Sequence, residues 1–143
     1  MKKILMFMIL CLTAPLSAQS IFVRADIAGA ANIDNTSAGY SALSVSVKTN
    51  AFSITGTPVA LLWDGATPEY HPNIEAALKI PKTRIYTGLG HIFGTSYQNT
   101  TYLVVTLWGP DNIPFTVNAG IGDNYQLISF GFYVKLGGQK KSK

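Results

Sequence analysis

Hydrophobic and polar side chains alternate with a period of two along most of this chain. In residues 21–27 the odd positions are apolar, and the even positions hold Phe22, Arg24 and Asp26. Residues 43–48, 74–80 and 115–121 repeat the pattern, with apolar side chains on one face and polar, charged or very small ones on the other. A period of two is typical of β-strands with two different faces, and the many Val, Ile, Thr, Tyr and Phe residues favour strands as well.

Clusters of Gly, Pro, Asn and Asp divide the alternating segments from one another. These breaks predict eight strands, at residues 21–31, 40–48, 51–62, 73–80, 84–93, 101–108, 113–121 and 125–136. Within 51–62 the alternation changes phase at Pro58, which predicts a bulge or two shorter strands. The segments between strands are alternately long and short except for the last one, as in an up-and-down meander.

The number and length of the segments indicate a closed membrane barrel. A barrel strand needs about nine to eleven residues to cross the hydrocarbon layer, and bacterial barrels have an even number of strands. We therefore expect an all-β fold, an antiparallel up-and-down eight-stranded transmembrane β-barrel. Its apolar face would contact outer-membrane lipid. Its lumen would hold a network of charged side chains: Arg24, Asp26, Lys48, Glu75, Lys79 and Arg84.

Aromatic residues collect near the predicted strand ends, where a membrane barrel carries two girdles at the lipid–water interfaces. The candidates for these girdles are Tyr40, Trp63, Tyr70, Phe93, Tyr97, Tyr102, Trp108, Phe115, Tyr125 and Tyr133. Residues 102–108 are ambiguous, because both faces of that strand are apolar.

Alternation is equally compatible with a soluble exported β-barrel or sandwich that binds a lipid-like ligand in its apolar interior.

The first 20 residues predict a secretory signal peptide. Lys2 and Lys3 precede an apolar run that is too short to cross a bilayer, and small residues follow it. Cleavage after Ala18 and cleavage after Ser20 both fit. The single cysteine, Cys11, lies in this segment. We therefore expect an exported chain with a barrel domain at 21–136 and a polar, lysine-bearing tail at 137–143.

The charge of the chain argues against a nucleic-acid partner. Two of the 11 Lys and Arg residues lie in the predicted signal, so nine basic residues face seven acidic ones in the remainder. Three of those nine lie in the last four residues. Nucleic-acid-binding domains concentrate basic residues on one face of the fold, and the nearly neutral body of this chain does not predict such a face.

The last apolar segment, SFGFYVKL at 129–136, has a polar residue, a glycine and two later apolar residues at fixed spacing. It resembles the C-terminal assembly signal of small bacterial outer-membrane β-barrel proteins. The matching residues are Ser129, Gly131, Val134 and Leu136. The resemblance implies that barrel-insertion machinery recognises the final strand, that this strand pairs with the first to close the sheet, and that the protein resides in the bacterial outer membrane.

Candidate catalytic and metal-binding residues are few. His91 and Ser96 are close in sequence but lack the pattern of a Ser-His lipid hydrolase, and they are typical of a strand that runs into a polar loop. His71 and Glu69 lack the further ligands that a metal site requires. The glycines of 88–94 precede no helix, so they do not predict a phosphate-binding loop. We expect no catalytic residues, no metal and no cofactor.

The sequence thus predicts a structural or surface-interaction protein that is not an enzyme. Three segments, 32–39, 63–72 and 94–100, would face outward and could bind an extracellular ligand. The lumen charges have two interpretations: a narrow pore with a gate, or a salt-bridged plug that stiffens the barrel. An eight-stranded barrel has little room beyond its own side chains, which favours the plug.

Overall fold

A computed structural model describes residues 20–33, 36–63, 69–93, 100–110, 112–123 and 125–137. In these ranges the chain consists of strands and turns, and no helix is long and apolar enough to span a membrane. The strands are β1 (Ser20–Ile33), β2 (Thr36–Lys48), β3 (Phe52–Trp63), β4 (Glu69–Tyr70), β5 (Asn73–Lys79), β6 (Ile85–Ile92), β7 (Thr100–Trp108), β8 (Phe115–Gly122) and β9 (Tyr125–Gly137).

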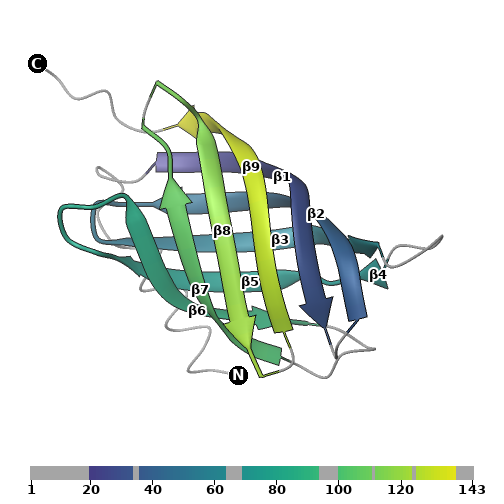
Figure 1. Ribbon diagram of the computed structural model, residues 1–143. Helices are drawn as coiled ribbons and strands as arrows, with labels where there is room; N and C mark the ends of the chain where they lie inside the picture. The colour runs from purple at the N-terminus through teal and green to yellow at the C-terminus, as the bar shows by residue number, and fades with distance from the viewer. Residues whose placement is uncertain are drawn as a thin grey trace, which may run out of the picture.

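Eight of these strands form a closed antiparallel barrel (Figure 1). Each strand pairs with its neighbour in the order β2-β1-β9-β8-β7-β6-β5-β3, and a further pairing of β3 with β2 completes the ring. The first and last strands meet along their whole length, from Ile21 opposite Gly137 to Ile33 opposite Tyr125. The two-residue strand β4 pairs only with Leu61 and Leu62 of β3. The prediction of an eight-stranded antiparallel barrel is therefore confirmed.

The two ends of the barrel differ in what they carry. We call the end where β1 begins and β9 finishes the near end; the turns after β2, β5 and β7 also lie there. The opposite end, where β3 and β6 finish and β9 begins, is the far end. In Figure 1 the near end is at the upper left and the far end at the lower right.

Side chains alternate between the inside and the outside of the barrel, as the period of two predicts. In β7, Tyr102, Val104 and Thr106 are buried, while Leu103 and Val105 between them are exposed. The ambiguity of residues 102–108 is thereby resolved. On β5 and β8 the inward side chains are polar or small, whereas those of β6 and β9 include Tyr86, Ile92 and Leu127. The large exposed side chains of these strands are mostly apolar.

Two irregularities interrupt the strand pairings away from the strand ends. The β2–β3 pairing shifts register between Leu43 and Val45, and Pro58 and Val59 are consecutive exposed residues on the opposing strand. This is the bulge predicted from Pro58, which has no amide hydrogen to donate to the sheet. The second irregularity lies in β1 after Asp26, where the pairings with both β2 and β9 shift.

The structure corrects the predicted loops. The segment 32–39 is mostly strand, because Asn32 pairs with Ser37 and Ala31 with Ala38. The segment 63–72 contains β4, and the amide of His71 donates to the carbonyl of Ala60 at 2.8 Å. In the segment 94–100, only Thr100 lies among the described residues, and it begins β7.

The predicted aromatic girdles are wrong for half of their members. Five of the ten residues point into the barrel and are buried, namely Tyr40, Tyr102, Trp108, Tyr125 and Tyr133. Trp63, Tyr70 and Phe93 are exposed at the far end, Phe115 is half-buried at the near end, and Tyr97 lies outside the described residues. The strand phase, and not closeness to a strand end, decides which way each ring points.

Candidate functional site

The interior of the barrel contains a buried ion pair between two residues of β1. The Nε atom of Arg24 lies 3.1 Å from Oδ2 of Asp26, and both side chains are almost completely enclosed. Alternation places both on the inner face, two positions apart. Burying either charge without the other would cost roughly several kcal/mol. Each side chain therefore makes the burial of the other charge less unfavourable.

Glu75 of β5 is the centre of a second polar group. Its Oε1 accepts a hydrogen bond from the Tyr102 hydroxyl at 2.9 Å and lies 3.4 Å from the amide nitrogen of Asn118. Thr106 in turn donates to Oδ1 of Asn118. Three strands, β5, β7 and β8, are joined across the lumen by these contacts.

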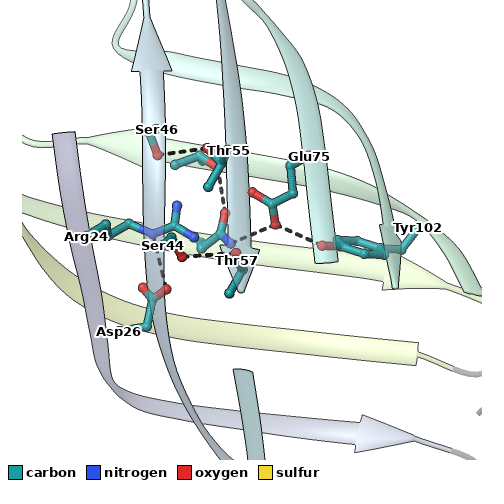
Figure 2. Close-up of polar contacts among 10 residues, drawn as sticks. Arg24, Asp26, Ser44, Ser46, Thr55, Thr57, Glu75 and Tyr102 are labelled. Carbon is teal, nitrogen blue, oxygen red and sulfur yellow. Dashed lines mark hydrogen bonds and ion pairs between the residues drawn. The ribbon is translucent and has the colours of Figure 1, made fainter. Parts of the chain in front are cut away.

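Hydroxyl pairs line the wall between β2 and β3. Ser44 and Thr57 are 3.0 Å apart at their side-chain oxygens, and Ser46 and Thr55 are 2.9 Å apart. Figure 2 shows that these pairs, the Arg24–Asp26 pair and Glu75 all point into the same interior space. We call this set, together with Tyr102, Thr106 and Asn118, the interior polar network. Its hydrogen bonds give partners to many of the buried polar groups, whereas Nη1 of Arg24 and Oδ1 of Asp26 have no hydrogen-bond partner among the described residues.

Close packing leaves little empty space around the network. The ring of Tyr102 lies over Gly90, where a Cβ atom would be only 2.3 Å from Cζ of the tyrosine. Tyr102 also packs against Tyr125, with ring centroids 4.8 Å apart. Glycine at position 90 is therefore required by the tyrosine that reaches Glu75.

The near end of the lumen is filled by three aromatic rings and a lysine. Phe22, Trp108 and Tyr133 contact one another with ring centroids 5.0 to 5.3 Å apart. The ammonium group of Lys48 lies 4.2 Å from the Trp108 ring centroid and 4.8 Å from that of Phe22. Such distances are within the range of cation–π attraction. We call these four residues the aromatic plug.

The six charged residues predicted for the lumen do not form one cluster. Arg24, Asp26 and Glu75 lie deep inside, and Lys48 belongs to the aromatic plug. Lys79 is half-buried at the last position of β5, and Arg84 is exposed in the turn before β6. Strand β5 ends at Lys79, and β6 begins directly after Arg84. Both residues continue the inward-facing positions of their strands, but they lie at the rim of the barrel and not in its interior.

The four residues that resemble an assembly signal lie on both faces of β9. Ser129 and Gly131 face inward, whereas Val134 and Leu136 are each 65% exposed on the outside. A Cβ atom at position 131 would lie 2.5 Å from Oδ1 of Asp26. Glycine at this position therefore also has a packing reason, since it makes room for the buried carboxylate.

The outer surface of the barrel is apolar along every strand of the ring. Large exposed side chains include Ile27 on β1, Leu43 on β2, Leu78 on β5, Leu89 on β6 and Phe130 on β9. Their exposed fractions range from 47% for Leu43 to 68% for Leu78. Water-soluble monomers rarely expose large contiguous apolar patches, so large exposed apolar side chains on every strand of the ring are unusual for such proteins.

The histidines do not form a site with the residues that are near them in sequence. His91 faces outward, and its Nδ1 lies 3.0 Å from the Thr101 hydroxyl, while Ser96 is outside the described residues. His71 is buried in the lumen at the far end. Within the described part of the chain, no group of three or more His, Cys, Asp or Glu residues could hold a metal ion.

Sequence reasoning missed the uncharged half of the interior polar network. Ser44, Thr57 and Asn118 are on the same alternating face as the charged residues, and that face was the available signal.

Comparisons with protein-family models, with curated proteins and with solved structures find no match to this chain. The fold and the arrangement of its faces therefore carry the functional argument.

Proposed function

We propose that this protein is an outer-membrane β-barrel with a structural or surface-interaction role and no catalytic activity. The observation that supports this proposal is the orientation of the faces. Arg24, Asp26 and Glu75 are enclosed, while large apolar side chains cover the outside of the ring. In water, the solvent would contact the apolar outer surface of such a barrel. In a membrane, the same surface would contact the lipid hydrocarbon, as in other membrane barrels.

The energetic preference for lipid is large. Moving one exposed Leu, Ile or Phe side chain out of water contributes about 1.5–3 kcal/mol. Leu78, Ile121 and Phe132 are more than half exposed, and similar residues occur on every strand of the ring. A closed barrel has no open sheet edge, so all of its backbone groups can be paired inside the hydrocarbon layer.

The filled interior favours a structural role over a pore. Tyr102, Val104 and Trp108 are at most 2% exposed, and the aromatic plug occupies the near end. An eight-stranded barrel has little room beyond its side chains. We propose that the interior polar network stiffens the barrel, and that any surface-interaction role belongs to the far end.

Fractionation of bacteria that express the full chain tests this proposal. We expect the protein in the outer-membrane fraction, with a different mobility on an SDS gel before and after boiling, because a closed barrel resists SDS until it is heated. Recovery in the soluble periplasmic fraction without a mobility difference would contradict the proposal. That result would favour a soluble exported barrel with a lipid-like ligand.

The far-end role has its own test. Segments 64–68 and 94–99 connect far-end strands and can be shortened separately in cells that display the barrel. Loss of cell-surface binding to a host matrix protein after shortening would support a surface-interaction role. If binding is present in the parent and unchanged in both shortened variants, the far-end assignment is wrong.

A further inference from the structure

The basic residues of the barrel are concentrated at one end. Four lie at or near the strand ends of the near end: Lys79 at the end of β5, Lys82 and Arg84 in the β5–β6 turn, and Lys135 two residues before the end of β9. We call them the near-end cation group. Lys82, Arg84 and Lys135 are exposed, and Lys79 is half-buried.

The far end differs from the near end in its charged residues. Its described residues include no Lys or Arg, while Glu69 in β4 and Asp123 in the β8–β9 turn are acidic. The sequences of 34–35, 64–68 and 94–99, which link far-end strands, also contain no Lys or Arg. Two basic residues of the described barrel lie outside this group: Lys48 belongs to the aromatic plug at the near end, and Arg24 is paired inside the barrel. The barrel therefore has one cationic end and one end without basic residues.

Lys82 occupies a backbone conformation that rarely suits a lysine. Its φ angle is 62°, and the amide of Thr83 donates to the carbonyl of Ile80 across the turn at 3.2 Å. Pro81 followed by a residue with positive φ is typical of a type II turn, where Gly or Asn is preferred. A lysine at this position places an ammonium group at the tip of the turn against the local backbone preference.

The near-end cation group adjoins the apolar outer surface. Ile80, two residues before Lys82, is 40% exposed, and Leu136, next to Lys135, is 65% exposed. Where apolar side chains face hydrocarbon, cations at their edge lie at the level of the lipid headgroups. Long Lys and Arg side chains can then keep their stems in apolar surroundings while their charges contact phosphate.

We propose that the near-end cation group binds the headgroups of anionic glycerophospholipids in the leaflet that surrounds the near end. This inference rests on the proposed function, because it needs the apolar surface to lie in a bilayer. Each basic residue near an anionic membrane surface adds about a fivefold preference. The far end, without basic residues, should show no such preference.

Tryptophan quenching by brominated lipids can test each end separately in the same barrel. Trp63 is exposed at the far end, and an Ile80→Trp substitution places a reporter at the near end in a Trp63→Phe background. Trp108 is enclosed in the lumen, so the Trp63→Phe protein alone serves as the blank. The protein is purified from cells expressing the full chain and reconstituted in vesicles of phosphatidylcholine and phosphatidylglycerol, with one or the other lipid brominated.

We expect brominated phosphatidylglycerol to quench the near-end reporter at least about fivefold more effectively than brominated phosphatidylcholine at equal mole fraction. Trp63 should be quenched without preference for phosphatidylglycerol. In the variant Lys79→Gln, Lys82→Asn, Arg84→Gln and Lys135→Gln the near-end preference should disappear, whereas quenching by phosphatidylcholine should not change.

Substitutions at position 82 separate charge from folding. Lys82→Asn removes the charge and also suits the turn, so it should not destabilise the barrel. Lys82→Arg keeps both the charge and the unfavourable φ angle. We expect the asparagine variant to lose about fivefold in near-end preference and the arginine variant to keep it.

The outcomes are distinct. Equal quenching of the near-end reporter by both lipids, or a preference that persists in the quadruple variant, would overturn the lipid assignment and leave the proposed function intact. Absence of quenching at both reporters would overturn the proposed function itself. Binding of soluble polyglutamate to the barrel in pure phosphatidylcholine, without a phosphatidylglycerol preference, would replace the lipid with an acidic soluble partner.

Discussion

The inner and outer faces of this barrel follow different rules, although they alternate along the same strands. Inside, many side chains contact particular partners, as Glu75 contacts Tyr102 and Ser46 contacts Thr55. Outside, Leu43, Val105 and Phe130 share only their apolar character. Substitutions that remove or add a few atoms on the inner face should therefore change the free energy of unfolding. On the outer face, mainly substitutions that introduce a charge should do so.

The largest effect is expected from breaking the buried ion pair. Asp26→Ala would leave the guanidinium group of Arg24 enclosed without its carboxylate, and we expect a loss of about 3–5 kcal/mol in the free energy of unfolding. Urea titration in phosphatidylcholine vesicles measures it. The double variant Arg24→Met, Asp26→Leu should recover much of the loss, and a single variant as stable as the parent would show that the pair has no structural role.

A charge on the outer face should cost nearly as much. Leu43→Arg would place a guanidinium group in the hydrocarbon layer, which destabilises a membrane barrel by about 2–4 kcal/mol near the midplane. Asn50→Arg, in the exposed turn after β2, is the control and should change the free energy by less than about 0.5 kcal/mol. If both arginines cost the same in the urea titration, the outer face is not in lipid.

A single methyl group should distinguish tight and open positions. Gly131→Ala would bring a Cβ atom to 2.5 Å from Asp26 Oδ1 and 2.7 Å from the Ala25 carbonyl oxygen. We expect a cost of about 1–3 kcal/mol. Gly56→Ala, where no atom lies within 4 Å of the new Cβ, should be neutral or slightly stabilising. Equal stability of the two variants would contradict the tight packing around Asp26.

The smallest effect is expected at the aromatic plug. Lys48→Met keeps most of the side-chain volume but removes the charge that faces Trp108 and Phe22, and we expect a loss of about 0.5–2 kcal/mol. Lys48→Arg should retain most of the interaction. The intrinsic fluorescence of Trp108 in a Trp63→Phe background should shift in the methionine variant only, and a similar shift in both would argue against a cation–π contact.

Alternation predicted much of the fold, because a period of two assigns each residue to a face without knowledge of its partners. With the turn residues it predicted eight strands, and at Pro58 a bulge or two shorter strands. The inward position of Arg24, Asp26 and Glu75 followed only from the membrane-barrel interpretation, which also needed the strand lengths, the aromatic positions and the C-terminal resemblance. Alternation could not orient residues 102–108, since Tyr102 and Trp108 are compatible with lipid and with an interior. The small residues at 90 and 120, which leave room for Tyr102, were the signal that could have decided it.

The ends of strands were the least predictable part. Ala31 and Ala38 have weak strand preferences, but each finds a partner because β1 and β2 are adjacent in the barrel. Lys79 and Arg84 have the inward phase of the lumen charges, yet the strands finish at those positions. The period of two predicts whether a side chain points inward or outward. How deep the side chain lies in the barrel depends instead on the register between neighbouring strands.

The pairing of β1 with β9 also has a kinetic consequence. The other strand pairs of the ring join segments that are close in sequence, whereas the β1–β9 pair joins the two ends of the described chain. This pair cannot form until β9 has been synthesised, and before then β1 presents an open edge that other chains could extend. The order of synthesis therefore requires the nascent chain to be held apart from its neighbours until its last strand arrives.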